Sequence, residues 1–290
     1  MPHPDWSSFS FEGIGTQWEI STPEALAPAV RRQLLETVSD YDMTYSRFRP
    51  DSLVSGLSRE PGSITLPGHA GALLGVYAAL YRLSGGAMTP LIGSSLERLG
   101  YDPAYTLTPA GNPVAPPRWE DVLDWTGTAL TVSQPVVLDI GAAGKGQLVD
   151  LLAGVLGTNG HSDFLIDGSG DMLHAGTHPV VVALEHPYNP GQAIGTVELN
   201  NSALCASASN RRAWGDGLHH VLDGTTGKPV HTTVATWTMA GSALEADALA
   251  TALFMLEPTP LQKEFDFAWL RVSSSGAATF SDRFEGRLFT

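Results

Sequence analysis

The amino-acid sequence predicts an α+β fold, in which antiparallel strands and helices do not alternate regularly. The 290 residues are 43% hydrophobic and only 16% charged, the composition of a globular chain with a sizeable core. Strand-like runs recur through the second half with few helical patterns between them, which favours α+β over a doubly wound parallel sheet. Neither an internal repeat nor a low-complexity tract is present.

The first half of the chain is expected to contain a strand, two helices and an irregular segment. The strand is predicted over residues 13–21 and the first helix over 23–39, because Pro23 suits a first helical turn. A second helix is predicted over 69–83, ending at Gly85 and Gly86. Prolines at 103, 109, 113, 116 and 117 exclude regular structure from residues 101–120 and predict a surface excursion or linker.

The second half begins with a predicted strand, glycine loop, helix and strand. These occupy residues 132–140, 141–146, 147–156 and 163–167. Further strands are predicted at 180–184, 196–199, 218–222, 234–240 and 267–272. Because they alternate poorly with helices, they are the main support for the α+β class.

Charge and cysteine content exclude several kinds of partner. The formal net charge of −14 argues against nucleic acid and anionic membranes, which bind basic patches. The single cysteine, Cys205, excludes an intrachain disulfide and a cysteine-rich zinc site. Residues 1–6 lack the basic and apolar regions of a signal peptide, and no apolar run approaches about 20 residues. We therefore expect a cytoplasmic protein that does not insert into membranes.

Residues 245–253, EADALATAL, form a helix pattern that is apolar all round yet carries a carboxylate and a hydroxyl. Ser242 and Glu245 fit the S-x-x-E capping box, so Glu245 is assigned to the helix start. Asp247 and Thr251 lie one turn apart on one face. Since a buried charge needs a partner, Asp247 requires either an Arg or Lys elsewhere or a hard metal ion such as Mg²⁺ or Ca²⁺.

The glycine loop carries a second candidate site. Asp139 precedes it and Lys145 lies where the next helix begins, and free backbone N–H groups at a helix start favour an anion such as phosphate. The spacing matches neither a P-loop nor G-x-G-x-x-G. A glycine turn with a solvated lysine is the alternative interpretation, and the run DGSGD at 167–171 likewise reads as a tight turn.

Two adjacent histidines precede the turn at residues 224–227. Neighbouring side chains on a strand point to opposite faces, so one of His219 and His220 is expected to be buried or to face a cleft, and the other to face solvent. A histidine at a polar strand end can act as a general base, and a structural histidine held by hydrogen bonds is the alternative.

The order of five segments resembles the ApbE family of FAD:protein FMN transferases. The segments are SRFRPDS (46–52), LDIGAAGKG (138–146), GSGD (168–171), HVLDGTTG (220–227) and EADALATAL (245–253), and the resemblance extends from residue 14 to beyond Thr251. It implies one domain over residues 1–290, an ApbE-like fold with mixed or antiparallel sheets flanked by helices, and an active site in a cleft between two lobes.

The same resemblance implies a reaction and a set of roles. Family members use Mg²⁺ to cleave FAD, pass FMN to a threonine of an acceptor flavoprotein with a D-x-x-T-x-T-like motif, and release AMP. It implies Asp247, Thr251 and the Ala142 carbonyl as metal ligands and His220 as the catalytic base. The residues that it implies contact FAD are Ile14, Phe48, Ala87, Met88, Thr89, Asp139, Lys145 and Leu222.

Two departures from the family pattern are visible. Residues 86–90, GAMTP, stand where many relatives have an aspartate, and Ser169 replaces a usual glycine. The chain contains no acceptor motif of its own, so the target is expected to be another protein. Two alternatives stay open from the sequence: a Mg²⁺-dependent FAD pyrophosphatase that transfers FMN to water, and a non-catalytic FAD-binding protein.

Overall fold

The fold is built on an antiparallel sheet of eight strands. The computed structural model describes residues 5–189 and 191–289, and within them the strand order of this sheet is β1-β2-β6-β7-β10-β15-β16-β17. Every neighbouring pair is antiparallel, which confirms the predicted α+β class. The strands are β1 (Ser7–Gly13), β2 (Thr16–Thr22), β6 (Phe164–Asp167), β7 (Asp171–Ala175), β10 (Ala203–Ala208), β15 (Thr233–Ala240), β16 (Phe267–Ser273) and β17 (Ala278–Phe280).

Helices cover one face of this sheet and a small second sheet covers the other. The helices are α1 (Pro28–Tyr45), α2 (Ala70–Leu83), α5 (Gly144–Thr158) and α6 (Ala243–Ala252). They share the larger core with strand residues such as Ile166, whereas its neighbour Leu165 packs into the second core. That second core lies against β8 (Val180–Glu185), β9 (Ala193–Leu199) and β18 (Gly286–Leu288). Because successive side chains of a strand point to opposite faces of the sheet, each strand contributes side chains to both cores.

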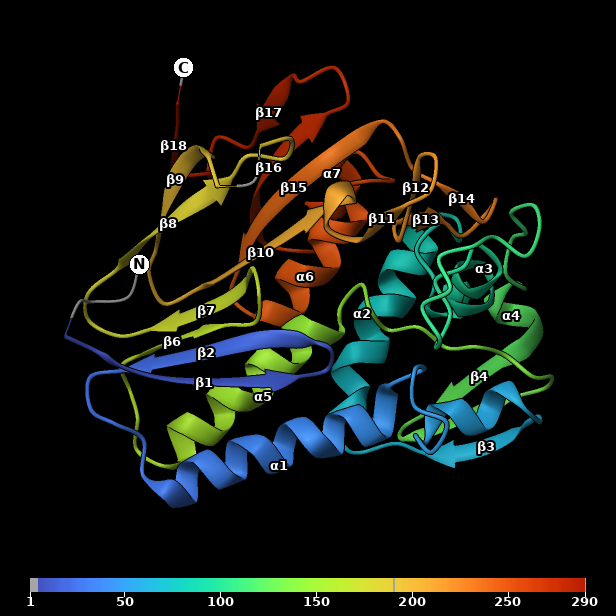
Figure 1. Ribbon diagram of the computed structural model, residues 1–290, viewed down its shortest axis with the longest axis horizontal. Helices are drawn as coiled ribbons and strands as arrows, with labels where there is room; N and C mark the ends of the chain where they lie inside the picture. Colours follow the sequence, from blue (N-terminus) through green and yellow to red (C-terminus); the bar gives the residue numbers. More distant parts are fainter. Residues whose placement is uncertain (1–4, 190, 290) are drawn as a thin grey trace.

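The remaining elements gather mostly at the end of the molecule away from β8 and β9 (Figure 1). They are η1 (Val54–Ser58), β3 (Gly62–Thr65), η2 (Pro90–Ile92), α3 (Gly93–Arg98), α4 (Trp119–Val122), β4 (Leu123–Thr126), β5 (Ala129–Val132), η3 (Ser209–Arg212), β11 (Ala213–Trp214), β12 (Leu218–His219), β13 (Leu222–Asp223), β14 (Lys228–Pro229) and α7 (Pro258–Leu261). Strands β3, β5 and β4 form a third antiparallel sheet.

The predictions for the N-terminal segment were partly wrong. The strand expected at 13–21 is the second half of a hairpin, because Ile14 and Gly15 form a left-handed turn with φ of 45° and 75°. The first helix begins at Pro28 instead of residue 23, so the proline that occupies its first turn is a later one. The second helix and its end before Gly85 are confirmed.

Two further strand predictions need correction. Of residues 132–140 only Val132 belongs to a strand, β5. The residues after it make isolated backbone hydrogen bonds in place of a strand ladder; for example, Asp139 N donates to Pro90 O at 2.8 Å. The strand expected at 218–222 is split into the two-residue strands β12 and β13. Residues 101–118 contain no helix or strand, as the prolines of 101–120 predicted, but the last two residues of that range begin the helix α4.

Among the described residues no helix is both long enough and apolar enough to cross a membrane. Residues 1–4, which enter the expectation about the signal peptide, lie outside the described part of the chain.

Candidate active site

The start of α6 is fixed by two capping side chains. Ser242 Oγ accepts a hydrogen bond from Glu245 N at 3.2 Å, so the predicted N-cap is confirmed. The carboxylate of Asp150, from the middle of α5, accepts the backbone N–H groups of Ala243 and Leu244, each at 2.9 Å. These bonds satisfy amides that a helix start leaves without partners.

A close approach of α5 to α6 places Asp247 at the first turn of α5. Gly146 N donates to Asp247 Oδ2 at 2.9 Å. A Cβ on Gly146 would lie 2.1 Å from Ala243 O and 2.7 Å from the Asp247 Cβ, so the position has no room for a side chain. Glycine at 146 therefore allows the two helices to meet and sets the position of the Asp247 carboxylate.

Asp247 and Thr251 are both buried, with 3% and 9% of their surface exposed. Burial and, after it, the charge of Asp171 raise the pKa of Asp247 to about 7. Thr251 Oγ1 lies 3.2 Å from Ser207 Oγ. A carboxylate whose ionised form is disfavoured in this way gains from a nearby cation.

Lys145 is half-buried and paired, which corrects the interpretation of a solvated lysine. Its Nζ lies 2.5 Å from Asp171 Oδ2, and the exposed fractions of the two side chains are 21% and 0%. Burial lowers the pKa of Lys145, but Asp171 and then Asp247 outweigh that effect, so its pKa lies above the usual value. Lys145 is therefore a cation held in place by the carboxylate of Asp171, the first residue of β7.

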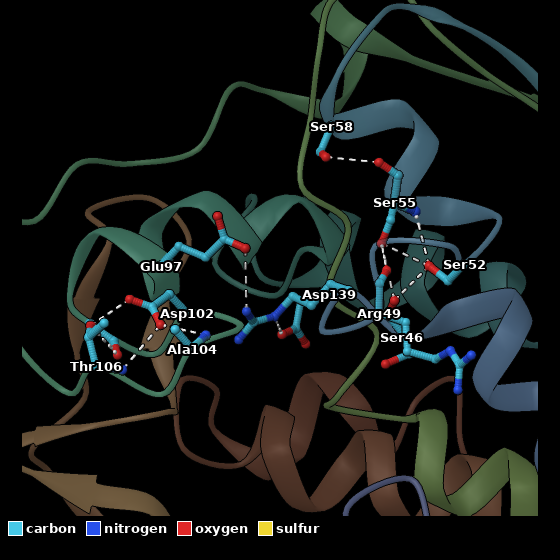
Figure 2. Close-up of polar contacts among 12 residues, drawn as sticks. Ser46, Arg49, Ser52, Ser55, Ser58, Glu97, Asp102, Ala104, Thr106 and Asp139 are labelled. Atoms are coloured by element: carbon cyan, nitrogen blue, oxygen red, sulfur yellow. Dashed lines mark hydrogen bonds and ion pairs between the residues drawn. The ribbon is translucent and has the colours of Figure 1, made fainter.

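Asp139 is held by a buried arginine from the SRFRPDS segment. Arg47 Nε donates to Asp139 Oδ2 at 2.5 Å, and Arg47 Nη1 lies 3.6 Å from Glu97 Oε1 (Figure 2). Burial would raise the pKa of Asp139, but the Arg47 charge and hydrogen bond outweigh it and leave that pKa below the usual value. Asp139 is thus an anchored carboxylate, and its Oδ1 accepts from Gly141 N at 2.7 Å.

His220, and not His219, faces the site. His219 is buried, its Nδ1 accepts from Val221 N at 3.3 Å, and its ring packs edge-on against His231. Burial, followed by the charge of Arg212, lowers the pKa of His220 to about 3, and its Nδ1 has no hydrogen-bond partner in the described residues. The neighbouring Asp223 carboxylate accepts from Thr225 N at 2.7 Å.

Two neighbouring cavities collect the residues that the family resemblance singled out. The first, the Asp247 cavity, has a volume of about 400 Å³, and the second, the Phe48 cavity, about 510 Å³. The Asp247 cavity is lined by Ala87, Met88, Thr89, Asp139, Ala142, Lys145, His220, Leu222, Asp247 and Thr251, among others. The Phe48 cavity is lined by Ile14 and Phe48 together with Asp139 and Lys145.

The two cavities share one wall. The residues lining both are Gly15, Tyr101, Asp139, Gly141, Lys145 and Arg212. Within the described residues no carboxylate forms an ion pair with Arg212, although its charge acts on Asp139, Asp247 and His220. The junction of the cavities therefore presents two basic side chains.

Three of these charged residues had no role in the sequence analysis. Arg47 lies in the SRFRPDS segment and Asp171 in the GSGD segment, but each meets its partner only through the tertiary structure: Arg47 is 92 positions from Asp139. Arg212 stood in no segment that was singled out. Its only sequence signal is that it is one of two adjacent arginines preceding Trp214 in an acidic chain.

The donor set around Asp247 fits a small hard cation. Asp247, Thr251 and Ala142 line one cavity, and the carboxylate, hydroxyl and carbonyl oxygens that these residues carry are ligands that suit Mg²⁺. In the described part of the chain no three His, Cys, Asp or Glu side chains form a metal-binding cluster. A cation held by these three residues would take its other ligands from substrate and water, as Mg²⁺ commonly does.

The fold and site define a class of α+β protein in which a helix pair presents oxygen donors beside a half-buried, ion-paired lysine at the junction of two cavities. A family model described as the ApbE family matches residues 14–266. The chain therefore belongs to the ApbE family, in agreement with the resemblance of its segments.

Relatives and solved structures extend over most of the chain. The FAD:protein FMN transferase of Klebsiella pneumoniae is 25% identical over 275 residues, covering 86% of this chain and 78% of that protein. The enzyme of the same description from Treponema pallidum is 26% identical over 264 residues, covering 81% and 73%. The ApbE protein of Thermotoga maritima superposes with a TM-score of 0.79 at 22% identity, covering 97% and 99%. The flavin transferase ApbE of Vibrio cholerae gives 0.77 at 18%, covering 96% and 98%, so the fold is shared.

Proposed function

We propose that this chain is an FAD:protein FMN transferase that uses Mg²⁺, cleaves FAD, attaches FMN through a phosphoester bond to a threonine of a target flavoprotein, and releases AMP. The observation that carries the proposal is the wall shared by the two cavities, where Lys145 and Arg212 lie within the same site as Asp247 and Thr251. Relatives in the same family carry the name of this activity.

The paired cavities match the shape and charge of a dinucleotide. FAD consists of two ring systems joined by a pyrophosphate, so two cavities that meet at a wall carrying Lys145 and Arg212, beside the Arg47-paired Asp139, suit it. Ligand pockets commonly measure about 300–1,000 Å³, and both cavities fall within that range. Lys145 is held by Asp171 and Asp139 by Arg47, so these charged groups are pre-positioned before substrate arrives.

Asp247, Thr251 and the Ala142 carbonyl are the residues that would hold the metal. When bound, Mg²⁺ supplies positive charge to the pyrophosphate oxygens as the leaving AMP departs. Lys145 adds a fixed positive charge at the first turn of α5, where helix N–H groups also favour an anion.

His220 is the proposed base for the acceptor threonine. It is neutral at pH 7 and can accept the threonine proton as the threonine oxygen attacks the phosphorus of the FMN half. The bond from that phosphorus to the AMP oxygen breaks, AMP leaves, and His220 returns its proton to solvent. A base with a pKa near 3 is weak. Burial is the main cause of that low pKa and the Arg212 charge the second, and phosphate charges beside Arg212 would offset the second cause and raise the pKa of His220.

One assay tests the proposal against its two alternatives. The protein is incubated with FAD, Mg²⁺ and an acceptor domain bearing a D-x-x-T-x-T motif. A fluorescent flavin band that survives denaturation, formed together with AMP, supports the transferase. AMP and free FMN with no band support the FAD pyrophosphatase, and bound FAD that stays intact supports a non-catalytic binding protein.

Variants separate the two roles inside the site. Asp247→Ala should abolish Mg²⁺-dependent AMP release, and unchanged release would remove the metal assignment. His220→Ala should retain FAD binding but lower the transfer rate by about 10²- to 10⁴-fold, the usual contribution of a general base. His178, an exposed histidine outside both cavities, provides the control: His178→Ala should transfer at the normal rate.

A further inference from the structure

The segment at residues 100–108, within the proline-rich region, is a tightly organised turn. Asp102 Oδ1 accepts from Ala104 N at 2.9 Å and from Thr106 N at 3.1 Å, and Asp102 Oδ2 accepts the Thr106 hydroxyl at 2.5 Å (Figure 2). Leu107 N donates to Gly100 O at 2.8 Å. Gly100 has φ of 97°, and a Cβ there would lie 2.4 Å from Thr108 N, so the two ends of the turn are in contact.

This turn holds two apolar side chains in an unfavourable backbone conformation. Tyr105 and Leu107 have φ of 51° and 50°, a region that residues other than glycine rarely occupy. Their side chains are also exposed to solvent to an unusual extent for large hydrophobic residues, with 53% and 43% of their surface accessible. Backbone strain of this kind persists where the surroundings enforce it, and it is concentrated at functional sites.

This segment places the Tyr105 ring against Phe48 in the lining of the Phe48 cavity. Tyr105 is nearly parallel to Phe48, at 5.3 Å between centroids and 17° between planes, and edge-on to Tyr101 at 5.6 Å and 86°. Both Tyr105 and Leu107 line the cavity. The guanidinium of Arg47 lies over the Phe48 ring, 4.1 Å from its centroid.

The Phe48 cavity is thus an aromatic-walled space that opens onto the cationic junction of Lys145 and Arg212. Aromatic side chains bind planar heteroaromatic rings by stacking, and a ring tethered to a phosphate at the junction would reach this wall. Exposed aromatic surface in an ordered, strained turn is explained if a ligand covers it.

We propose that Tyr105 forms the stacking wall for one planar heteroaromatic ring of the dinucleotide substrate, and that residues 100–108 determine how tightly this chain binds it. The inference rests on the proposed function. The flavin and the adenine are both planar heteroaromatic rings, so either of them can stack on Tyr105. The experiment therefore measures the binding of the two halves of FAD separately.

The test is FAD binding without Mg²⁺, measured by flavin fluorescence, for wild type and Tyr105→Asn. Asparagine tolerates the left-handed conformation, so the turn is kept while the ring is removed. Loss of one stacking contact should weaken FAD binding roughly 5- to 150-fold. Tyr105→Phe should bind like wild type. Tyr105→Leu, which keeps apolar bulk but removes the ring, should lose as much affinity as Tyr105→Asn, so that the loss does not depend on the folding of one variant.

Binding of FMN and of AMP then identifies the ring. Weaker FMN binding with unchanged AMP binding assigns the flavin to Tyr105, and the reverse result assigns the adenine. The control is Tyr188→Asn, which removes a tyrosine that is 54% exposed and lines neither cavity, and which should leave all three affinities unchanged.

Two negative outcomes have different meanings. Unchanged affinity for FAD, FMN and AMP in Tyr105→Asn and Tyr105→Leu overturns the stacking wall and leaves the transferase proposal standing. A wild-type protein that binds no FAD overturns the proposed function, and the inference with it.

Discussion

Replacing Gly146 with alanine probes the contact on which the candidate metal site depends. The added methyl would meet Ala243 O at 2.1 Å, about 1.4 Å closer than the ~3.5 Å of a normal contact, and the Asp247 Cβ at 2.7 Å. Both neighbours belong to α6, and the nearest is a backbone atom that cannot rotate away. The two helices would have to separate by about 1 Å, since atoms in a packed core have little free space.

A matched control exists on the same helix. Gly154 is exposed, and a Cβ there meets nothing within 4 Å. Both replacements gain up to about 1 kcal/mol of helix propensity, so the difference between the variants isolates the clash. We expect Gly154→Ala to raise the free energy of unfolding. We expect the free energy of unfolding of Gly146→Ala to be roughly 2–3 kcal/mol lower than that of Gly154→Ala, the upper part of the range for overpacking.

Equilibrium urea unfolding measures this difference, and AMP release measures its consequence for the site. Moving α6 by about 1 Å would break the Gly146 N to Asp247 Oδ2 bond and cost about 10²-fold in rate, whereas Gly154→Ala should release AMP normally. Equal stability of the two variants would refute the close approach. A destabilised Gly146→Ala with full activity would refute the placement of Asp247 in the reaction.

Three further variants test the charges around the site. Asp139→Asn leaves Arg47 buried without its closest carboxylate. It should lower the free energy of unfolding by roughly 3 kcal/mol, the lower part of the range for breaking a buried ion pair, because Glu97 remains 3.6 Å from Arg47. Calorimetry measures this loss, and a loss under about 1 kcal/mol would contradict the pairing. Asp150→Ala removes the acceptor for the first two amides of α6 and should cost about 1–2 kcal/mol in urea unfolding, with no cost arguing against the cap. Burial lowers the pKa of His174, so its pKa in the folded protein lies below its pKa in the unfolded chain. The contribution of neutral His174 to the free energy of unfolding is therefore fully present above about pH 6.5, and it is lost as the pH falls through the folded pKa. His174→Gln should flatten the decline in stability below pH 6.5, and an unchanged slope would assign it to other groups.

Local features of the chain were predictable because they depend on neighbours within a few residues. Ser242 as N-cap and the shared face of Asp247 and Thr251 follow from capping and from the 3.6-residue period. The irregular course of residues 101–118 follows from proline, which lacks a backbone donor. Boundaries were less predictable: α1 begins at Pro28, since several prolines suited a first turn and packing chose among them.

The sequence by itself determined the α+β class and the helix that carries Asp247, and its family resemblance supplied part of the set of residues lining the two cavities. The tertiary structure decided how these residues are charged and held. Arg47 meets Asp139, and Lys145 meets Asp171, across segments whose proximity arises from the strand order and the contact of α5 with α6. Tyr105 reached the Phe48 cavity in the same way. Periodicity and capping act along the chain, whereas ion pairing, desolvation and aromatic stacking depend on distances through space that exist only after folding.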